Sequence, residues 1–453
     1  MPPHHATLPA TAALPAFAAR LGSMVDASVR PLFQDDAPGA AIIVAIDGQT
    51  VFRQGYGLAD FATHKPATPD MAFRLGSITK QFTAAAILLL AEQGKLETSD
   101  DIRQYLPAFP DKGKRITIEH LLTHTSGIPC YTEQLSYLGN MARDMTVDEM
   151  IASFKDMPLE FAPGEQFAYN NSGYFLLGAI IERVSGQTYA SFLAQHIFTP
   201  LGMRHTAYEG HQRNAVVQAS GHSHEEGKFG PAAPLSMTQP YAAGSLVSTV
   251  DDLARWDQAI SQSRLLQERS WQRAFTPYVL ANGNATGYGY GWEITTLRGS
   301  TAIEHGGGIN GFATHAIRLP EERVFVAVLT NSDDGIADAD FVAHKVAAMA
   351  IGKPFPEREA IQLSEQALDA MVGTYMVDSK TNRQVIREGK RLYMQQTGGD
   401  RHEITPYASD AFFIPNTLVE VRFRKTQGGK VDSMVVTGSG PETPYPLIGA
   451  GNP

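Results

Sequence analysis

The order of strand-like and helix-like segments most constrains how this chain of 453 residues can fold. Alternating and β-branched runs typical of strands occur at residues 39–46 and 50–57, joined by an Asp47-Gly48 turn, and strands return only after residue 285. The segments between them mostly follow the helical period. Strands from both ends that enclose a helical insert predict one antiparallel sheet flanked by helices, with an all-helical region on one side. The expected fold class is α+β.

Local periodicity places the remaining elements. Helices are predicted where apolar residues recur every three or four positions, and strands where they alternate with polar ones. The predicted helices span residues 14–32, 81–90, 118–124, 147–155, 173–184, 189–198 and 337–351, and the later strands span 288–294, 302–305, 312–319 and 324–329.

The chain changes character near residue 353. Lys353-Pro354-Phe355-Pro356 interrupts regular structure, and the short alternating runs after it, separated by Gly, Asp and Asn, predict strands. A second domain is expected because 453 residues exceed what one hydrophobic core usually serves. We predict a large domain over residues 1–352, a linker over 353–360 and a small β domain, a barrel, over 361–453.

The composition narrows the classes of partner. Asp and Glu number 47 against 37 Lys and Arg, a formal charge of −10, and no basic stripe occurs, which argues against nucleic acid as a partner. Hydrophobic residues make up 43% of the chain, yet no apolar run reaches the roughly 18 residues that a membrane span needs. We expect a globular protein without a membrane span. Its oligomeric state stays open.

The N-terminus and the cysteine content bear on the compartment. Residues 1–5 and the Ala/Leu/Pro-rich sequence after them lack the basic start and apolar core of a secretory signal. Two expectations stay open: a cytoplasmic protein if this N-terminus is native, and a periplasmic or secreted one if a signal peptide was removed. Cys130 is the only cysteine, so it cannot form an internal disulfide, and we interpret it as a packing residue.

The sequence Ser77-Ile78-Thr79-Lys80 opens the long apolar helical run at 81–90. Residues three apart on a helix lie one above the other, so the Lys80 amine can reach the Ser77 hydroxyl without help from the rest of the fold. In the first turn, Ser77 also lies near unpaired backbone N–H groups that favour a developing oxyanion. The pattern suits acyl transfer, although S-x-x-K alone is a weak signal.

Two further motifs strengthen that signal. Tyr169-Asn170-Asn171 falls at a predicted loop-to-helix junction, where polar groups can point into a cleft. A nearby ammonium such as Lys80 would favour the phenolate form of Tyr169 and make it a useful base. His305-Gly306-Gly307-Gly308 lies at the end of a predicted strand, where missing side chains let a substrate backbone lie along the edge.

With these motifs the chain resembles the serine β-lactamase and penicillin-binding protein superfamily, in the branch of class C β-lactamases, D-aminopeptidases, DD-peptidases and related esterases. The resemblance covers about residues 35–350. It implies a sheet flanked by a helical domain, with the active site between them. The motifs that carry it are Ser77–Lys80, Tyr169–Asn171, His305–Gly307, Leu121–Gly127 and Gly244–Thr249.

The resemblance also implies roles for single residues. Ser77 would be the acylated nucleophile, and Lys80 and Tyr169 would handle its proton, with Tyr169 as the principal base. Asn171 would orient the substrate amide. The backbone N–H groups of Ser77 and Gly308 would form the oxyanion hole.

One departure from the lactamase pattern bears on the substrate. His305-Gly306-Gly307 replaces Lys-Thr-Gly and offers neither a permanent charge nor a hydroxyl to a β-lactam carboxylate. We therefore expect a serine hydrolase that cleaves an ester or amide through an acyl-enzyme, of the esterase or D-peptidase type, with weak or no β-lactamase activity. A true β-lactamase and a catalytically silent binder with this fold stay open as alternatives. By analogy with relatives, a loop of the C-terminal domain would restrict the substrate.

Competing interpretations of other motifs are weaker. Gly306–Gly311 fits the G-x-G-x-x-G pattern of dinucleotide sites, but a strand follows it instead of the required helix. The pair His120/His124 lacks the glutamate of a zincin and is assigned to structural packing, and His222/His224 fits a solvated hairpin. Neither a metal nor a cofactor is expected. Glu165 is assigned to a turn, and the segment Tyr241–Ser245 is left open between packing and the cleft edge.

Overall fold

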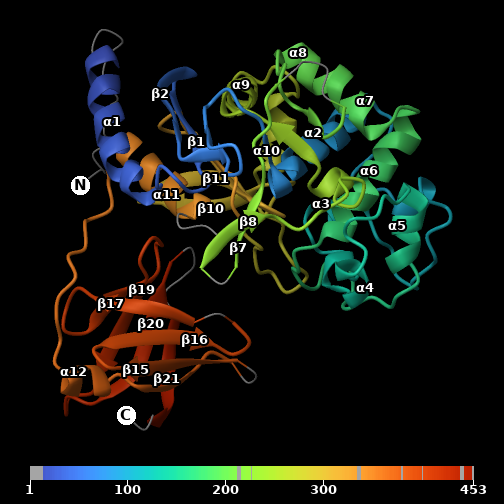
Figure 1. Cartoon of the computed structure of the whole chain (residues 1–453). Helices are drawn as coiled ribbons and strands as arrows, with labels where there is room; N and C mark the ends of the chain where they lie inside the picture. Colours follow the sequence, from blue (N-terminus) through green and yellow to red (C-terminus); the bar gives the residue numbers. More distant parts are fainter. Residues whose placement is uncertain are drawn as a thin grey trace, which may run out of the picture. The chain divides into compact units, whose positions relative to one another are not determined.

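The computed structural model describes residues 14–211, 216–225, 227–333, 338–378, 381–399, 401–438 and 443–450. The chain divides into two compact units, Met1–Pro354 and Phe355–Pro453 (Figure 1). The N-terminal segment on which the expected compartment depends, and Ala337 at the start of a predicted helix, lie outside the described residues.

The first unit is built on a six-stranded antiparallel sheet in the order β10-β11-β12-β13-β1-β2. The N-terminal strand β1 pairs with β13 from the far end of the unit, with Ala40 opposite Thr330 and Ile46 opposite Val324. Both strands are buried along their whole length, as their unbroken apolar runs require. The predicted α+β class and the sheet closed by both ends of the domain are therefore confirmed. The strands are β1 (Ala40–Ile46), β2 (Gln49–Tyr56), β10 (Glu293–Leu297), β11 (Ser300–Ile309), β12 (Phe312–Leu319) and β13 (Val324–Thr330).

Helices cover both faces of this sheet. On one face, α11 (Ala339–Ala350) contacts β12 and β13, and α1 (Leu14–Val29) lies beside it (Figure 1). On the other face, Arg318 of β12 donates hydrogen bonds to Asp257 and Ser261 of α9 (Val250–Ser261). The sheet is thus the middle layer of the unit.

The segments between β2 and β10 form the predicted helical region and several short strands. The helices are α2 (Thr79–Glu92), α3 (Ile118–Leu122), α4 (Leu135–Leu138), α5 (Val147–Phe154), α6 (Asn171–Ser185), α7 (Tyr189–Leu193), α8 (Thr199–Leu201) and α10 (Glu268–Ala274). The short strands are β3 (Leu58–Asp60), β4 (Lys65–Pro66), β5 (Phe73–Arg74), β6 (Ala207–Tyr208), β7 (His222–Glu225), β8 (Lys228–Pro231) and β9 (Leu246–Ser248).

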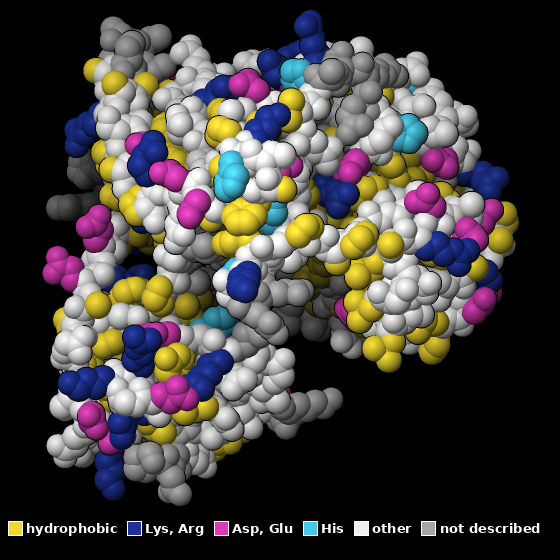
Figure 2. All heavy atoms as spheres, viewed as in Figure 1, with side chains coloured by type: hydrophobic (Ala, Val, Ile, Leu, Met, Phe, Trp, Pro, Cys, Tyr) yellow, Lys and Arg dark blue, Asp and Glu magenta, His cyan; other side chains and the backbone are white. Residues whose placement is uncertain are grey.

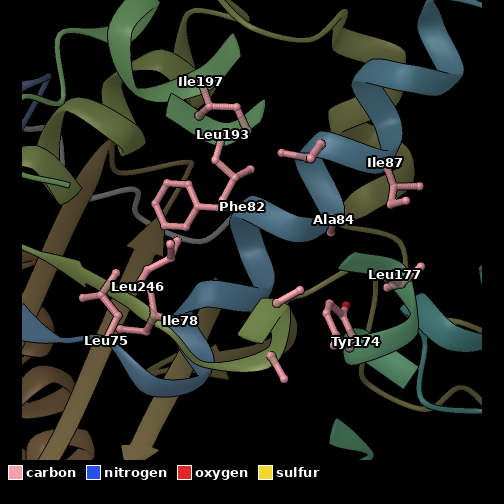
Figure 3. Close-up of a cluster of buried hydrophobic side chains, with 14 of the residues drawn as sticks. Leu75, Ile78, Phe82, Ala84, Ile87, Tyr174, Leu177, Leu193, Ile197 and Leu246 are labelled. Atoms are coloured by element: carbon pink, nitrogen blue, oxygen red, sulfur yellow. The ribbon is translucent and has the colours of Figure 1, made fainter. Parts of the chain in front are cut away.

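Helix α2 runs through the middle of a hydrophobic core. Most of its side chains are buried, because α6 and α7 pack against it. Figure 3 shows Phe82 of α2 pointing toward Leu193 and Ile197. In the turn before α2, Ile78 points toward Leu246. The apolar run that follows Lys80 therefore holds the start of α2 in a fixed position.

One predicted strand differs from the observed one. The pattern at residues 288–294 predicts a strand, but β10 begins at Glu293. Gly287 and Gly291 have positive φ angles of 74° and 79°, which interrupt an extended backbone. At Gly291 a Cβ atom would lie 2.7 Å from the Lys80 carbonyl oxygen, so this loop approaches α2 too closely for any side chain.

The second unit is a closed antiparallel barrel, as predicted. Eight strands pair in chain order, and β14 closes the ring against β21. Helix α12 (Glu365–Asp369) precedes the strands β14 (Gly373–Met376), β15 (Asn382–Glu388), β16 (Arg391–Gln396), β17 (Arg401–Pro406), β18 (Ala411–Phe413), β19 (Glu420–Lys425), β20 (Val431–Thr437) and β21 (Thr443–Ala450).

Surface charges are mixed. Figure 2 shows Lys and Arg side chains interspersed with Asp and Glu on the visible face, without a continuous basic patch among the described side chains. None of the described helices combines the length and hydropathy that crossing a bilayer requires.

Candidate active site

Ser77 lies in a single 3-10 turn, Gly76–Ile78, that leads into α2. Gly76 has a φ of 52°, and a Cβ there would lie 3.0 Å from the Gly308 nitrogen, so the turn and strand β11 adjoin through their backbones. Leu75 and Ile78 are buried on either side, whereas Ser77 is partly exposed. The packing fixes the backbone and leaves the Ser77 hydroxyl accessible.

Lys80 is fully buried, and its Nζ lies 2.9 Å from Ser77 Oγ, as the spacing predicted. Nζ also donates hydrogen bonds to Asn171 Oδ1 at 2.9 Å and to the Ala243 carbonyl oxygen at 3.0 Å. Burial lowers the pKa of Lys80 to about 7. A neutral amine has two hydrogens and one lone pair. With both hydrogens on these two oxygens, the lone pair faces the Ser77 hydroxyl.

Tyr169 precedes α6, and its ring centroid lies 4.7 Å from Lys80 Nζ. Burial raises the pKa of the Tyr169 phenol above its usual value, and a hydrogen bond with the Ser77 side chain offsets only part of this rise. The residue is nevertheless 36% exposed, so water moderates the rise. The expectation that Lys80 holds Tyr169 near phenolate is wrong for this structure, because burial disfavours charge on both groups.

Asn171 is the first residue of α6, and the side chain of Asn170 caps the helix by accepting a hydrogen bond from the Gly173 N–H. The Asn171 Oδ1 faces Lys80, and its Nδ2 donates to Thr132 Oγ1 at 3.2 Å. The Asn171 amide therefore orients Lys80. A contact with a substrate amide stays a prediction.

His305 lies on β11 and is 2% exposed. Its Nε2 is 2.8 Å from the Tyr288 hydroxyl and its Nδ1 is 2.6 Å from the Gly306 carbonyl oxygen. Burial, assisted by the nearby Lys80, lowers the pKa of His305 to about 3. We assign the neutral tautomer in which Nδ1–H donates to Gly306 and Nε2 accepts from Tyr288. His305 therefore brings no positive charge to the site.

Close packing requires a glycine at one of the positions after His305. At Gly307 a Cβ would lie 2.1 Å from the Leu75 carbonyl oxygen and 2.4 Å from Thr314 Oγ1. Gly308, in contrast, is exposed and a Cβ there would meet nothing within 4 Å. Strand β11 thus touches the turn of Ser77 at Gly307 and is open to solvent at Gly308.

His124 is a neighbour of the site that the sequence assigned to packing. It is 1% exposed, has a φ of 57°, and its ring lies 4.3 Å from that of Tyr169. Its Nδ1 accepts a hydrogen bond from the Asn170 N–H at 3.0 Å. This ring therefore supports the loop that carries Tyr169. Nothing in the sequence pattern pointed to that contact.

A residue assigned to packing and a segment left open between packing and the cleft edge also lie beside the site. Cys130 is buried as expected, and its Sγ accepts a hydrogen bond from the Asn171 N–H at 3.3 Å. The segment Tyr241–Ser245 supplies the Ala243 carbonyl that holds Lys80. Backbone acceptors leave no signature in side-chain identity, so this one could not be predicted.

The weaker motifs have structural explanations. Strand β12 follows Gly306–Gly311, as expected, so no helix is present to bind a dinucleotide there. His120 accepts a hydrogen bond from the Thr117 N–H within a helix cap. His222 lies in the predicted hairpin, but it is 4% exposed and not solvated, because its Nε2 accepts a hydrogen bond from the Phe61 N–H. Glu226 of that motif lies outside the described residues.

Comparison with known proteins adds the family. The family named Beta-lactamase matches residues 20–350. Penicillin-binding protein 4* of Bacillus subtilis is 30% identical over 84% of this chain and 89% of its own length. A D-aminopeptidase of Gluconobacter oxydans is 28% identical over 80% of this chain and 66% of its own, so about a third of that enzyme lies outside the match. The octameric penicillin-binding protein homologue from Pyrococcus abyssi superimposes with a TM-score of 0.67 at 26% identity, covering 94% of this chain and 99% of that one.

Proposed function

Because this chain belongs to the β-lactamase family, we propose that it is a serine hydrolase that forms an acyl-enzyme on Ser77. The observation that carries the proposal is the buried Lys80 amine, 2.9 Å from Ser77 Oγ and bound otherwise to uncharged oxygens. An amine with a pKa of about 7 is half deprotonated at neutral pH, where a general base works best.

In acylation, Lys80 takes the Ser77 proton as Oγ attacks the substrate carbonyl carbon. The substrate carbonyl oxygen becomes negatively charged and accepts hydrogen bonds from the backbone N–H groups of Ser77 and Gly308. The tetrahedral intermediate then loses its leaving group. Tyr169 donates the proton that the departing nitrogen or oxygen needs, and Lys80 returns a proton to Tyr169.

Deacylation reverses these roles. Water attacks the acyl carbon, its proton passes to Lys80 through Tyr169, and Ser77 Oγ leaves protonated. This assignment keeps Tyr169 a neutral phenol throughout, which agrees with the burial that raises its pKa. Lys80 is the principal base and Tyr169 is the proton carrier to the leaving group.

The substrate class follows from the relatives and from His305. The D-aminopeptidase relative supports an amide of a D-amino acid, and an ester of a small acyl group passes through similar intermediates. A neutral His305 offers no charge to a β-lactam carboxylate. We therefore propose esterase or D-peptidase activity with weak or no β-lactamase activity. A true β-lactamase and a silent binder are the alternatives to be tested.

The test is intact-mass spectrometry after exposure to a fluorophosphonate, a p-nitrophenyl ester, a D-alanyl peptide amide and penicillin. We expect a fluorophosphonate adduct on Ser77, turnover of the ester or the D-alanyl amide, and no rapid turnover of penicillin. Ser77→Ala should lose the adduct and all turnover, and Ser99→Ala, at an exposed serine, should keep both. If the wild type forms no adduct and turns over no substrate, the protein is the catalytically silent binder and the proposed hydrolase is wrong. Fast penicillin hydrolysis would establish the lactamase.

A further inference from the structure

A second cluster of chemically active side chains lies on the other face of strand β11. Glu304 of β11, His315 of β12 and His344 of α11 are buried, and one potential ligand atom from each lies within 4.8 Å of the others. Asp340, one turn before His344 on α11, borders the cluster. None of these residues takes part in the hydrolase mechanism above.

The register of the sheet explains why the two sites are separate. Side chains alternate between faces along a strand, so Glu304 and His305 point to opposite faces of the sheet. His315 pairs with Gly306 and therefore shares the face of Glu304. Because Gly306 has no side chain, the His315 ring can lie against the strand, where a Cβ at Gly306 would be 3.4 Å from its Nδ1.

The contacts of the two imidazole rings restrict which ring nitrogens can carry a hydrogen. The Nε2 atoms of His315 and His344 both lie 2.9 Å from the same oxygen, Glu304 Oε2. Their Nδ1 atoms both face Asp340 Oδ1, at 3.4 and 3.0 Å. A neutral imidazole has one N–H, so it cannot donate on both sides. His344 Nδ1 also lies 2.9 Å from the Asp340 carbonyl oxygen, so it carries the hydrogen of this ring. Unless a second proton is present, the Nε2 lone pair of His344 then faces Glu304 Oε2, and a cation between these two atoms satisfies both.

We propose that Glu304, His315 and His344 form a binding site for a divalent transition metal ion of the Zn²⁺ class. Asp340 accepts from His344 Nδ1–H and lies 3.4 Å from His315 Nδ1, so the Nε2 atoms of both rings face the Glu304 carboxylate, as histidine ligands oriented by outer oxygen atoms do. One divalent ion in place of two protons leaves the net charge unchanged. Two imidazoles and one carboxylate are also a ligand set that zinc uses with a fourth position open.

The dimensions fit with small adjustment. Ligand atoms around a tetrahedral zinc at about 2.0–2.1 Å stand roughly 3.3 Å apart, and the two Nε2 atoms are each 2.9 Å from Glu304 Oε2. Glu293 lies opposite Glu304 in the sheet and adds a further carboxylate near the cluster. Thr295 donates a hydrogen bond to the other Glu304 oxygen, which fixes the carboxylate.

A metal here joins three elements behind the proposed active site. It would hold β11, β12 and α11 together at the level of Gly306, one residue from His305 on the opposite face. Its role is structural, because the cluster is buried and lies across the sheet from Ser77. The proposal therefore does not depend on the hydrolase reaction.

The test measures metal in the untagged full-length protein. After dialysis against zinc-containing and then zinc-free buffer, we expect about one zinc ion per chain by plasma mass spectrometry, and a melting temperature that falls by several degrees with a chelator and recovers with zinc. His344→Gln and Glu304→Gln should lose the zinc. His402→Gln, at an exposed histidine of the barrel, should retain it.

Cobalt spectroscopy of the wild type keeps the test independent of the variants. Co²⁺ in this site should give the intense visible bands of tetrahedral nitrogen and oxygen ligation. The proposal is overturned if the dialysed wild type contains no zinc, binds it more weakly than about 10 μM, or gives only the weak spectrum of hydrated cobalt. The cluster would then be held by hydrogen bonds and ion pairs among its own side chains. Zinc retained by both His344→Gln and Glu304→Gln would also overturn it.

Discussion

Two buried polar clusters in the same unit are partnered in opposite ways. Among the described residues, Lys80 has only uncharged hydrogen-bond partners, and burial lowers its pKa to about 7. Glu304 is also buried, but the hydrogen bonds from His315 and His344 outweigh burial and hold its pKa below the usual range. A buried group without a counter-ion gives up its charge and becomes reactive, whereas one with counter-ions keeps its charge and binds elements together.

The largest effect is expected from removing the amine that lacks a counter-ion. Lys80→Met should reduce the rate of Ser77 acylation by about 10²–10⁴-fold, because the general base is lost. Single-turnover kinetics with a p-nitrophenyl ester measures this. Acylation within a few-fold of the wild-type rate would show that Lys80 is not the base.

The same variant, Lys80→Met, also tests how the buried amine affects the free energy of unfolding. The folded-state pKa of Lys80, about 7, lies below its ordinary value of 10.5. Protonation therefore penalises the folded state increasingly as the pH falls from 10.5 to 7, by an amount on the order of a few kcal/mol. The stability of Lys80→Met relative to wild type should be highest at pH 7 and should decrease toward pH 10, as measured by urea unfolding. A difference that does not change with pH would contradict this.

Removing the counter-ion from the other cluster should have the opposite effect on stability. Glu304→Gln removes the carboxylate that neutralises the cationic side of the cluster, and leaving a buried charge unpaired typically costs about 3–5 kcal/mol. Urea unfolding measures the loss, and Glu388→Gln, at an exposed glutamate of the barrel, is the control. A loss below that of the control would show that the cluster does not stabilise the fold.

A carboxylate placed beside Lys80 should give this amine the counter-ion that it lacks, as the groups of the Glu304 cluster have. Wild-type kcat/KM should rise with pH through about 7 as Lys80 loses its proton. In Asn171→Asp the new anion contacts Nζ, raises the pKa of Lys80, and should shift this limb toward alkaline pH with about 10–100-fold lower activity at pH 7. Asn140→Asp, at an exposed asparagine, should leave the profile unchanged. An unshifted limb in Asn171→Asp would exclude Lys80 as the titrating base.

The smallest effect is expected at Tyr169. If it carries a proton to the leaving group, Tyr169→Phe should lower kcat by about 10-fold or somewhat more for an amide, and less for a p-nitrophenyl ester, whose leaving group needs no proton. The limb near pH 7 should remain. If the rise in activity near pH 7 is lost in Tyr169→Phe, the Tyr169 phenol is the principal base.

The fold was predictable because its signals are local. Strand alternation at residues 39–57 and 312–329 and the breaker at Lys353–Pro356 identify the sheet and the barrel without tertiary information. The contact of Lys80 with Ser77 was equally local, since helix geometry alone brings residues three apart together. The strand expected at 288–294 is not formed because Gly291 has a positive φ and lies too close to α2 for a side chain.

The electrostatics of the site could not be predicted in this way. The pKa of Lys80 depends on its burial against α6 and the Ala243 carbonyl, which are both far from Lys80 in the sequence. Sequence reasoning placed an ammonium beside Tyr169 because it had no measure of burial. The cluster of Glu304, His315 and His344 was also missed, since its members lie on three elements and form no spaced motif.

The pairing of β1 with β13 has a consequence for synthesis on the ribosome. Ala40 and Thr330 lie opposite each other in the sheet, although 290 positions separate them in the sequence. The nascent chain can pair β1 with β2 early, but the other edge of this wholly apolar strand stays unpaired until nearly the entire first unit has been translated. Translation that stops before residue 324 leaves β1 without this neighbour, as an aggregation-prone edge.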